Sequence, residues 1–458
     1  MAMTTVLDSS IFGSLFTDEE IAKLIDDDAQ VRALVEVEIA LARAEARVGV
    51  IPSSAAEQIA KATDPKKIDM GALARGTARS GFPIIALVQE LRKLVGAQAA
   101  PYLHWGATTQ DIMDTACVLQ LRSVIKVFEN RLAELARYLG ELAHLHRRMV
   151  VAGRTHGQQA LPISFGLKVA AWLAPFVRHG DRLNQMTSRL LVVQFGGAAG
   201  TLAALGDKGL AVMQELAEEL KLATPVMPWH AQRDSFAEFA GWLSLVTGSL
   251  GKMAQDIILL AQTEVEEVAE SAEEGRGGSS TMPQKSNPIT SELIVAAART
   301  NASLLSAMHN ALIHEHERAT HGWQVEWLTL PQMVALTGGA LKHALYLAKN
   351  LQVDDKKMRE NIARADDVIL AEAAVFALAK AMPRPKAEEL VKKACGIATS
   401  ERKPLIEVVK NLAAGALPDR AVDWQSLSAP ENYLGDTQKI IDRVLESANK
   451  LGLKRFHV

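Results

Sequence analysis

Residues 121–142 read LRSVIKVFENRLAELARYLGEL, and this stretch decides the fold. Large apolar side chains recur in it at three- and four-residue steps: Leu121, Val124, Ile125, Phe128, Leu132, Leu135, Leu139 and Leu142. Such spacing places them on one face of an α-helix that packs against other helices. Because the stripe continues over more than twenty residues, it predicts a long rod. Thirty helical residues would span about 45 Å.

The positions of the prolines extend this expectation to the rest of the chain. No proline occurs within residues 102–161, 176–224, 229–282, 289–330 or 332–382, and each interval has room for a long helix. Strand signals are scarce, and aromatic residues make up only 5% of the sequence. The sequence therefore predicts an all-α protein built as an elongated helical bundle.

One segment resembles a strand. Leu190 to Phe195 read LLVVQF and are followed by GGAAGT. A strand running into a nucleotide-binding glycine loop would need GxGxxG spacing and a surrounding βαβ pattern, and this segment has neither. We expect a tight turn or a close backbone approach that joins helical segments.

Changes in helix length and proline content suggest three domains. We expect an N-terminal helical domain at residues 1–112, a central long-helix bundle at 113–362, and a C-terminal helical domain at 363–458. Pro383, Pro385, Pro404 and Pro418 break the last domain into shorter helices.

The overall composition narrows the cellular setting. The chain has 458 residues, 48% hydrophobic content and a net charge of −3, a balance that does not favour nucleic acid as a partner. We find no secretory signal and no uninterrupted apolar run that would span a bilayer. Cys117 and Cys395 lie far apart and give neither a disulfide framework nor metal-ligand spacing. A cytoplasmic protein without a membrane partner is expected.

Two polar segments interrupt the helical pattern. The first, residues 102–115, reads YLHWGATTQDIMDT and contains His104, Thr108 and Thr109. It fits a capped helix start, and it equally fits a carboxylate site made of hydroxyl and backbone N–H groups. The second, residues 153–162, reads GRTHGQQALP, and its run of Arg154, Thr155 and His156 is hard to explain as purely structural.

A third segment, Gly278 to Pro288, reads GSSTMPQKSNP. Two prolines restrict its backbone, while Lys285 and Asn287 offer a charge and an amide donor close to Ser279 and Ser280. This combination of hydroxyl, ammonium and amide groups would suit the binding of an anion. A serine hydroxyl is too weakly acidic to act as a base unaided, and a nearby lysine could stabilise its alkoxide.

A histidine-rich stretch, HEHERATH at residues 314–321, invites a zinc interpretation. It is not HExxH: His314 and His316 would point to different sides of a helix, and His314 and His321 lack a third ligand at a clear spacing. We therefore expect no metal site in this stretch.

Taken together, the three polar segments resemble the fumarase/aspartase/adenylosuccinate lyase superfamily. GSSTMPQKSNP is similar to its signature loop, SSxMPxKxN, and the other two segments resemble its first and second motifs in the same order. The resemblance extends from about residue 9 to past 360. It implies three all-helical domains, a central bundle in a homotetramer, active sites shared between subunits, and no metal or organic cofactor.

Members of this superfamily eliminate a group β to a carboxylate, or add it in reverse, through an aci-carboxylate. By motif position, the resemblance implies that Ser279 handles the carbon-bound proton, that Lys285 and Asn287 stabilise the intermediate, and that His156 is the general acid. Preorganised donors of this kind are worth several kcal/mol, roughly 3, in a closed site. The remaining candidates for binding substrate are His104, Thr108, Thr109, Arg154, Thr155, Ser280 and Arg318.

The stretch at residues 316–331, HERATHGWQVEWLTLP, narrows the choice within the superfamily. Gly322, Trp323 and Trp327 stand where the adenylosuccinate branch holds a phosphate, and indole rings cannot replace a phosphate clamp. The chain is more similar to the lactonising cycloisomerases of the superfamily, which act on a small tricarboxylate. An adenylosuccinate or argininosuccinate lyase, and an inactive structural member, remain as alternatives. Ser286 departs from many relatives, which carry Arg or Val there.

Lactonisation itself leads to a further expectation. The nucleophile is a carboxylate of the substrate, already ionised, so the general acid that related lyases need is partly redundant. We therefore hypothesise that Ser279 matters more than His156. Gly275, Gly277 and Gly278 beside the serine loop could hinge a lid that closes over substrate.

Overall fold

The computed structural model describes residues 5–271, 282, 285–418 and 420–453. It is 71% helical, with 18 α-helices and few strands in the described part of the chain, so the predicted all-α fold is confirmed. The proposed hinge glycines Gly275, Gly277 and Gly278 lie outside the described residues.

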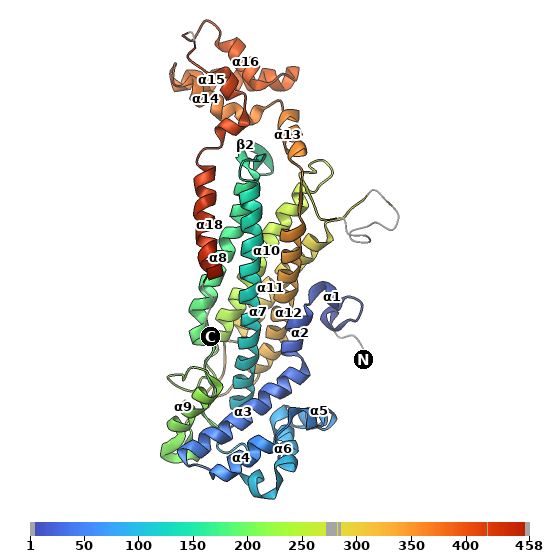
Figure 1. Ribbon diagram of the computed structural model, residues 1–458, viewed down its shortest axis with the longest axis vertical. Coiled ribbons are helices and arrows are strands. Elements are labelled where there is room, and N and C mark those ends of the chain that lie inside the picture. Colours follow the sequence, from blue (N-terminus) through green and yellow to red (C-terminus); the bar gives the residue numbers. More distant parts are fainter. Residues whose placement is uncertain (1–4, 272–281, 283–284, 419, 454–458) are drawn as a thin grey trace. The chain divides into compact units, whose positions relative to one another are not determined.

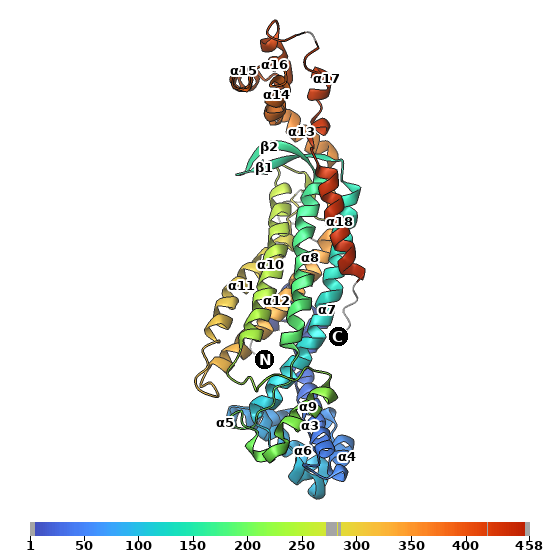
Figure 2. The same cartoon turned by 90° about the vertical axis from the view of Figure 1, so that its left-hand side faces the viewer.

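The helices and strands are shown in Figures 1 and 2. The α-helices are α1 (Gly13–Phe16), α2 (Glu19–Ile25), α3 (Asp27–Val48), α4 (Ser53–Ala62), α5 (Met70–Ser80), α6 (Pro83–Ala99), α7 (Thr109–Leu145), α8 (Phe165–Leu190), α9 (Gly209–Leu220), α10 (Asp234–Leu260), α11 (Ile289–Asn310), α12 (Gly322–Asn350), α13 (Asp355–Arg364), α14 (Ala371–Leu378), α15 (Arg384–Glu401), α16 (Leu405–Ala413), α17 (Trp424–Leu427) and α18 (Thr437–Leu453). The strands are β1 (Val150–Thr155), β2 (Gln158–Ser164), β3 (Val268–Ala269) and β4 (Gln352–Val353).

The chain divides into two compact units. Unit 1 comprises Met1–Arg131, His179–Gly248 and Ala296–Lys342, and unit 2 comprises Leu132–Arg178, Ser249–Val295 and His343–Val458. The boundaries fall inside the long helices α7, α8, α10, α11 and α12. The division into domains at 1–112, 113–362 and 363–458 stays a prediction.

The long helices agree with the apolar stripe. Helix α7 has 37 residues, so the predicted rod is confirmed. Of the eight stripe residues, all but the partly exposed Leu142 are at most 3% exposed. The expectation that prolines mark the ends of helices was wrong at two positions, because Pro175 lies inside α8 and Pro331 lies inside α12. A proline removes one backbone N–H and bends the helix, and a long helix with a well-packed face can absorb that loss.

Unit 1 has its core where four helices meet. Helices α3, α4, α6 and α9 pack together, as the blue and green elements of Figures 1 and 2 show. Leu34 and Leu41 of α3 and Leu87 and Leu91 of α6 are at most 1% exposed in this core. Among the long helices, Trp242 of α10 donates through Nε1 to the backbone oxygen of His179 in α8 at 2.9 Å.

Unit 2 contains a β-hairpin that we did not predict. Strands β1 and β2 pair antiparallel, and β1 contacts α13. Buried residues of β1, α13, α14, α15 and α16 form one apolar core (Figure 2). The apolar residues of the hairpin do not alternate cleanly with polar ones, so a period-two pattern was hard to recognise. The strand-like segment Leu190–Phe195 forms only an isolated bridge from Val192 to Ala223.

Helix α10 is long and apolar enough to cross a membrane by length and composition, with a mean hydropathy of 1.2 over 18 residues. Half of that window is buried inside the structure. Phe239, Leu243 and Val246 are among its fully buried residues. Core helices of soluble proteins share these properties, because a helix buried on most sides is apolar all round.

Glu45 is a buried acid in the α3 core, with an exposed fraction of 0%. Burial, and then the charge of Glu38, raise its pKa to about 9 from an ordinary value of 4.5. A carboxyl whose pKa is raised in the folded state contributes most stability below its unfolded pKa, and loses that contribution as pH rises towards the folded pKa.

We expect Glu45→Gln to stabilise the protein increasingly between about pH 5 and pH 9, because the neutral amide has no ionised form in the unfolded chain. At one pKa unit per roughly 1.4 kcal/mol, the gain reaches a few kcal/mol at alkaline pH. Thermal unfolding at pH 5 and pH 8.5 measures it. Glu215→Gln, at a partly exposed position of α9, is the matched control. An equal gain for Glu45→Gln at both pH values would contradict the expectation.

Candidate active site

In unit 1 the first polar segment surrounds the start of α7. The backbone N–H of Thr108 donates to Oδ2 of Asp111 at 3.0 Å, which caps the helix, and Thr108 Oγ1 accepts from Nη1 of Arg318 at 2.8 Å. The structure thus joins two predicted substrate residues, Thr108 and Arg318. Thr109 is the first residue of α7. His104, a few residues earlier, contacts Glu38 through Nδ1 at 2.7 Å.

Asp111 anchors this region and was missed as an individual residue, because from sequence it was one polar group among several. It is 0% exposed and accepts hydrogen bonds from the backbone N–H groups of Gly196 and Gly197 at 3.0 and 2.9 Å. His230 Nε2 lies 2.7 Å from Asp111 Oδ1. The glycine segment is therefore a close backbone approach, as expected, and a Cβ on Gly196 would lie 2.6 Å from Pro228.

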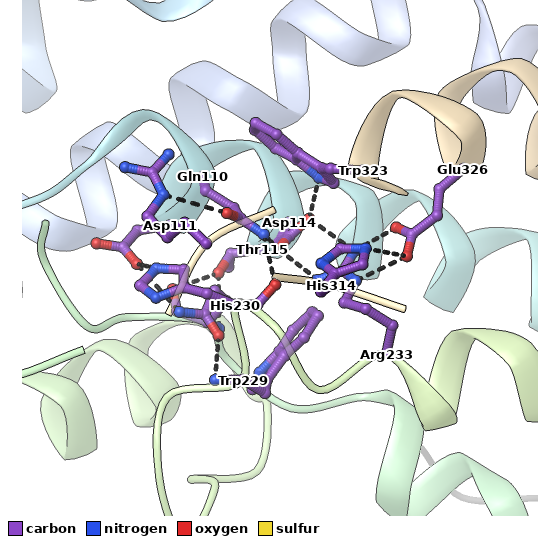
Figure 3. A network of polar contacts seen from close by, with 12 residues as sticks. Gln110, Asp111, Asp114, Thr115, Trp229, His230, Arg233, His314, Trp323 and Glu326 are labelled. Atoms are coloured by element: carbon purple, nitrogen blue, oxygen red, sulfur yellow. Dashed lines mark hydrogen bonds and ion pairs between the residues drawn. The ribbon is translucent and has the colours of Figure 1, made fainter. Parts of the chain in front are cut away.

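Beside it lies a buried ionic triad, which Figure 3 shows in close-up. Arg233 donates through Nη1 to Oδ2 of Asp114 at 2.6 Å and through Nε to Oε1 of Glu326 at 2.8 Å. Burial alone would lower the pKa of Arg233, but the charges and hydrogen bonds of the two carboxylates outweigh burial and raise it. The triad joins α7, α10 and α12 within unit 1, since Arg233 directly precedes α10.

Aromatic rings fill the space next to the triad. Trp323 donates through Nε1 to Oδ1 of Asp114 at 2.9 Å, its ring stacks on Phe82 at 5.8 Å between centroids, and Trp327 lies edge-on at 4.7 Å. The two indole rings line a pocket of about 270 Å³ whose charged lining is two carboxylates and one guanidinium. A net negative, apolar pocket is unsuited to a phosphate or a tricarboxylate.

The histidine-rich stretch 314–321 shows no metal-binding arrangement. The side chain of His314 is buried, burial lowers its pKa, and its Nε2 lies 3.8 Å from Glu326 Oε1. Among the described residues, no group of three or more His, Cys, Asp or Glu side chains is placed to hold a metal ion.

In unit 2 the second polar segment is the tip of the β1–β2 hairpin. Thr155 pairs with Gln158, so His156 and Gly157 form the two-residue turn, with φ of 51° and 77°. Positive φ at both central positions defines a type I′ turn. Histidine is strained in this region, and such strain often marks functional sites. Thr155 and His156 are exposed, so the turn presents the imidazole to its surroundings.

Arg154 is held inside unit 2 by an ion pair. Its guanidinium donates to both carboxylate oxygens of Glu267 at 2.8 and 2.6 Å, and Asn361 Nδ2 donates to Oε1 of Glu267 at 3.0 Å. Glu267 is 0% exposed. This clamp fixes the end of β1, directly before the turn that carries His156. The role of Arg154 in binding substrate stays a prediction.

The signature loop leads into α11. Lys285 is exposed, Asn287 is partly exposed, and α11 begins at Ile289. Glu270 is 8% exposed and accepts from the backbone N–H groups of Thr290 and Ser291 at 3.1 and 2.8 Å, which caps the helix start. Ser279 and Ser280 lie outside the described residues.

Comparison with known proteins now adds to this geometry. A model of the lyase family matches residues 11–302, and a model of the adenylosuccinate lyase C-terminus matches residues 367–444. The first covers well over half of the chain. The chain belongs to this lyase family. Membership confirms the superfamily inferred from the three polar segments.

Individual members of the lyase family match nearly end to end. The 3-carboxy-cis,cis-muconate cycloisomerase of Acinetobacter baylyi is 41% identical over 96% of this chain and 99% of its own length. The crystal structure of the 3-carboxy-cis,cis-muconate lactonizing enzyme from Pseudomonas putida has a TM-score of 0.90 at 39% identity, covering 97% of this chain and 100% of that one. Trans-aconitate decarboxylase 1 of Mycosarcoma maydis is 38% identical over 95% of this chain and 88% of its own length.

Proposed function

We propose that the protein is a cycloisomerase that interconverts 3-carboxy-cis,cis-muconate and its lactone, 2-carboxy-5-oxo-2,5-dihydrofuran-2-acetate, in the breakdown of aromatic compounds. The observation that carries this proposal is the nearly full-length similarity to a cycloisomerase at 41% identity and to a lactonizing enzyme at a TM-score of 0.90. The polar residues of all three motifs are present in the sequence.

The proposed reaction forms one bond and transfers one proton. A carboxylate oxygen of the substrate adds to its conjugated double bond, the electron pair moves onto the other carboxylate as an aci-carboxylate, and the carbon α to that group then takes a proton. Ser279 supplies this proton. Lys285 and Asn287 stabilise the intermediate, because donors preorganised towards developing charge lower the barrier. The reaction as proposed uses no cofactor.

The binding residues follow from the charge of the substrate. Three carboxylates need cationic and hydrogen-bonding partners, and guanidinium groups pair well with carboxylates. Arg318, next to Thr108 at 2.8 Å, is the candidate in unit 1. Arg154 is a second candidate, although its pairing with Glu267 favours a structural role. The remaining candidates are His104, Thr109, Thr155 and Ser280.

The main alternative, an adenylosuccinate lyase, needs a phosphate site. Trp323 and Trp327 instead form an aromatic cluster with Phe82 beside two buried carboxylates, Asp114 and Glu326. That environment repels a phosphate. The substrate assay therefore compares 3-carboxymuconate with adenylosuccinate, argininosuccinate and trans-aconitate. We expect turnover of the first compound at least about 100-fold more efficient than of the others, and preferred cleavage or decarboxylation of another substrate would overturn the proposal.

We further propose a cytoplasmic homotetramer whose sites are shared between subunits. The exposed hairpin tip with His156 and the exposed Lys285 support this, because each presents a polar group outward from unit 2. Leu245 of α10 and Leu328 of α12 are 51% and 69% exposed, as expected for helix faces that a neighbouring subunit covers.

Mixing inactive variants tests whether sites are shared. Suppose that Ser279 and His156 of one site come from different subunits. Refolding Ser279→Ala together with His156→Asn in equal amounts then gives mixed tetramers, in which roughly a quarter of the active sites contain both native residues by random assembly. Activity should rise above the average of the two parent variants. A mixture that stays at that average, although gel filtration shows mixed tetramers, would count against shared sites.

A further inference from the structure

His104 is held from behind by a buried glutamate. Glu38 of α3 is 1% exposed, and its Oε1 lies 2.7 Å from Nδ1 of His104. The imidazole itself is 19% exposed. One ring nitrogen therefore faces the core, and the ring is oriented by a carboxylate as ligand or catalytic histidines commonly are.

The backbone at His104 is constrained as well. Its φ is 58°, in the left-handed region that non-glycine residues rarely adopt. Two residues later Gly106 has φ of 70°, and a Cβ there would lie 2.9 Å from Leu205. A strained conformation persists only where its surroundings determine it, so the strain marks His104 as a positioned group.

Three charged groups set the protonation of His104. Burial would lower its pKa, but the charge and hydrogen bond of Glu38, and the charge of Asp111 in α7, outweigh burial and raise the pKa. Arg92 in α6 opposes them. With Nδ1–H donating to Glu38, a protonated ring keeps Nε2–H as a second donor.

A second acid lies on the same helix as Glu38. Glu45 follows seven residues later on α3, on the same face, and both of its carboxyl oxygens are buried without a hydrogen-bond partner in the described protein. Its pKa of about 9 keeps it neutral at physiological pH. A neutral Glu45 adds no further negative charge to that of Glu38 on α3.

We propose that Glu38 is a positioning residue that fixes His104 through Nδ1 and keeps it as an imidazolium whose Nε2–H binds a substrate carboxylate. The role towards substrate rests on the proposed function. The protonation of His104 does not, because it is a property of the free protein.

Glu38→Gln tests the proposal, since the amide keeps the shape and an acceptor but removes the charge. With labelled histidine, the His104 resonance is identified among the 12 histidines by its loss in His104→Gln. We expect its pKa to fall, because the charge of Glu38 is the main influence that raises it. At neutral pH, KM for 3-carboxymuconate should rise about tenfold with a smaller change in kcat, as when a charge-assisted hydrogen bond is lost, and KM should recover as the pH is lowered.

A matched control separates charge from general disturbance. Glu215→Gln removes a partly exposed ion-pair partner of Arg47, which lies on α3 like Glu38, and should leave both the His104 titration and KM unchanged. Glu38→Asp keeps the charge, so it should keep a raised His104 pKa. If Glu38→Gln does not fold, the wild-type titration decides, because a His104 pKa at or below the ordinary histidine value would overturn the proposal. In a His104→Gln background, Glu38→Gln should add little to KM.

Two outcomes overturn the proposal. The first is an unchanged His104 titration in folded Glu38→Gln. The second is an equal rise in KM for Glu38→Gln with and without His104, because Glu38 would then act by another route. If the wild-type protein does not turn over 3-carboxymuconate, the proposed function fails by itself, and the titration still decides whether Glu38 keeps His104 charged.

Discussion

Ser279→Ala is expected to lower kcat for lactonisation by about 10³-fold, within the range that a positioned proton donor contributes. Without the hydroxyl, the carbon α to the second carboxylate has no positioned proton source. KM should change far less, because the substrate carboxylates bind to other groups. Steady-state kinetics with 3-carboxymuconate measure both constants.

His156→Asn tests whether the general acid matters less than the proton donor Ser279. The attacking carboxylate is already ionised in lactonisation and leaves without protonation in reverse, so the loss in kcat should be at least about tenfold smaller than for Ser279→Ala. His156 occupies a type I′ turn with φ of 51°, which asparagine also tolerates, so the hairpin should persist. A loss at His156 equal to or larger than that at Ser279 contradicts the asymmetry.

Arg233→Leu is expected to destabilise the protein by about 3–5 kcal/mol, because it leaves two buried carboxylates without their cationic partner. Asp114 and Glu326 are 2% and 5% exposed, and burial already raises the pKa of Glu326. Thermal or denaturant unfolding of the purified variant measures the loss. If Arg233→Leu is insoluble, Arg233→Lys is measured in its place. Lysine keeps the positive charge, so the stability of this variant should lie between those of the wild type and Arg233→Leu.

The matched control is Arg189→Leu. Arg189 pairs with Glu238 on the surface, where the two side chains are 53% and 42% exposed. Exposed pairs contribute about 0–1 kcal/mol, because water and salt screen them. Comparable losses at Arg189 and Arg233 would mean that burial of the triad has no special energetic weight.

The sequence predicted the helical fold well because helix packing repeats a simple pattern. The stripe from Leu121 to Leu139 is buried as its spacing required. Helix ends predicted from proline positions were wrong at Pro175 and Pro331, since one missing hydrogen bond does not end a helix that is otherwise well packed. The β1–β2 hairpin escaped detection because its residues do not alternate, and its turn is His156-Gly157 rather than Asn-Gly.

The candidate site was predictable where polar residues cluster along the sequence. Thr108 and Arg318 are an example, since both were chosen from motifs and lie 2.8 Å apart. Residues that act across long sequence separations were not predictable. Glu38 and His104 are 66 positions apart, and nothing in the α3 sequence distinguishes Glu38 from a solvated glutamate. Only folding brings a buried carboxylate and an imidazole together.

The account is tested most directly by following 3-carboxymuconate with purified protein in deuterium oxide. We expect the ultraviolet absorbance of the conjugated diene to disappear. The lactone formed should carry one deuterium, at the CH2 carbon of its acetate group, and Ser279→Ala should abolish most of this conversion. Persistent diene absorbance with folded wild-type protein, or consumption of substrate to a product other than the lactone, would contradict the claim that this lyase-family member is a cycloisomerase.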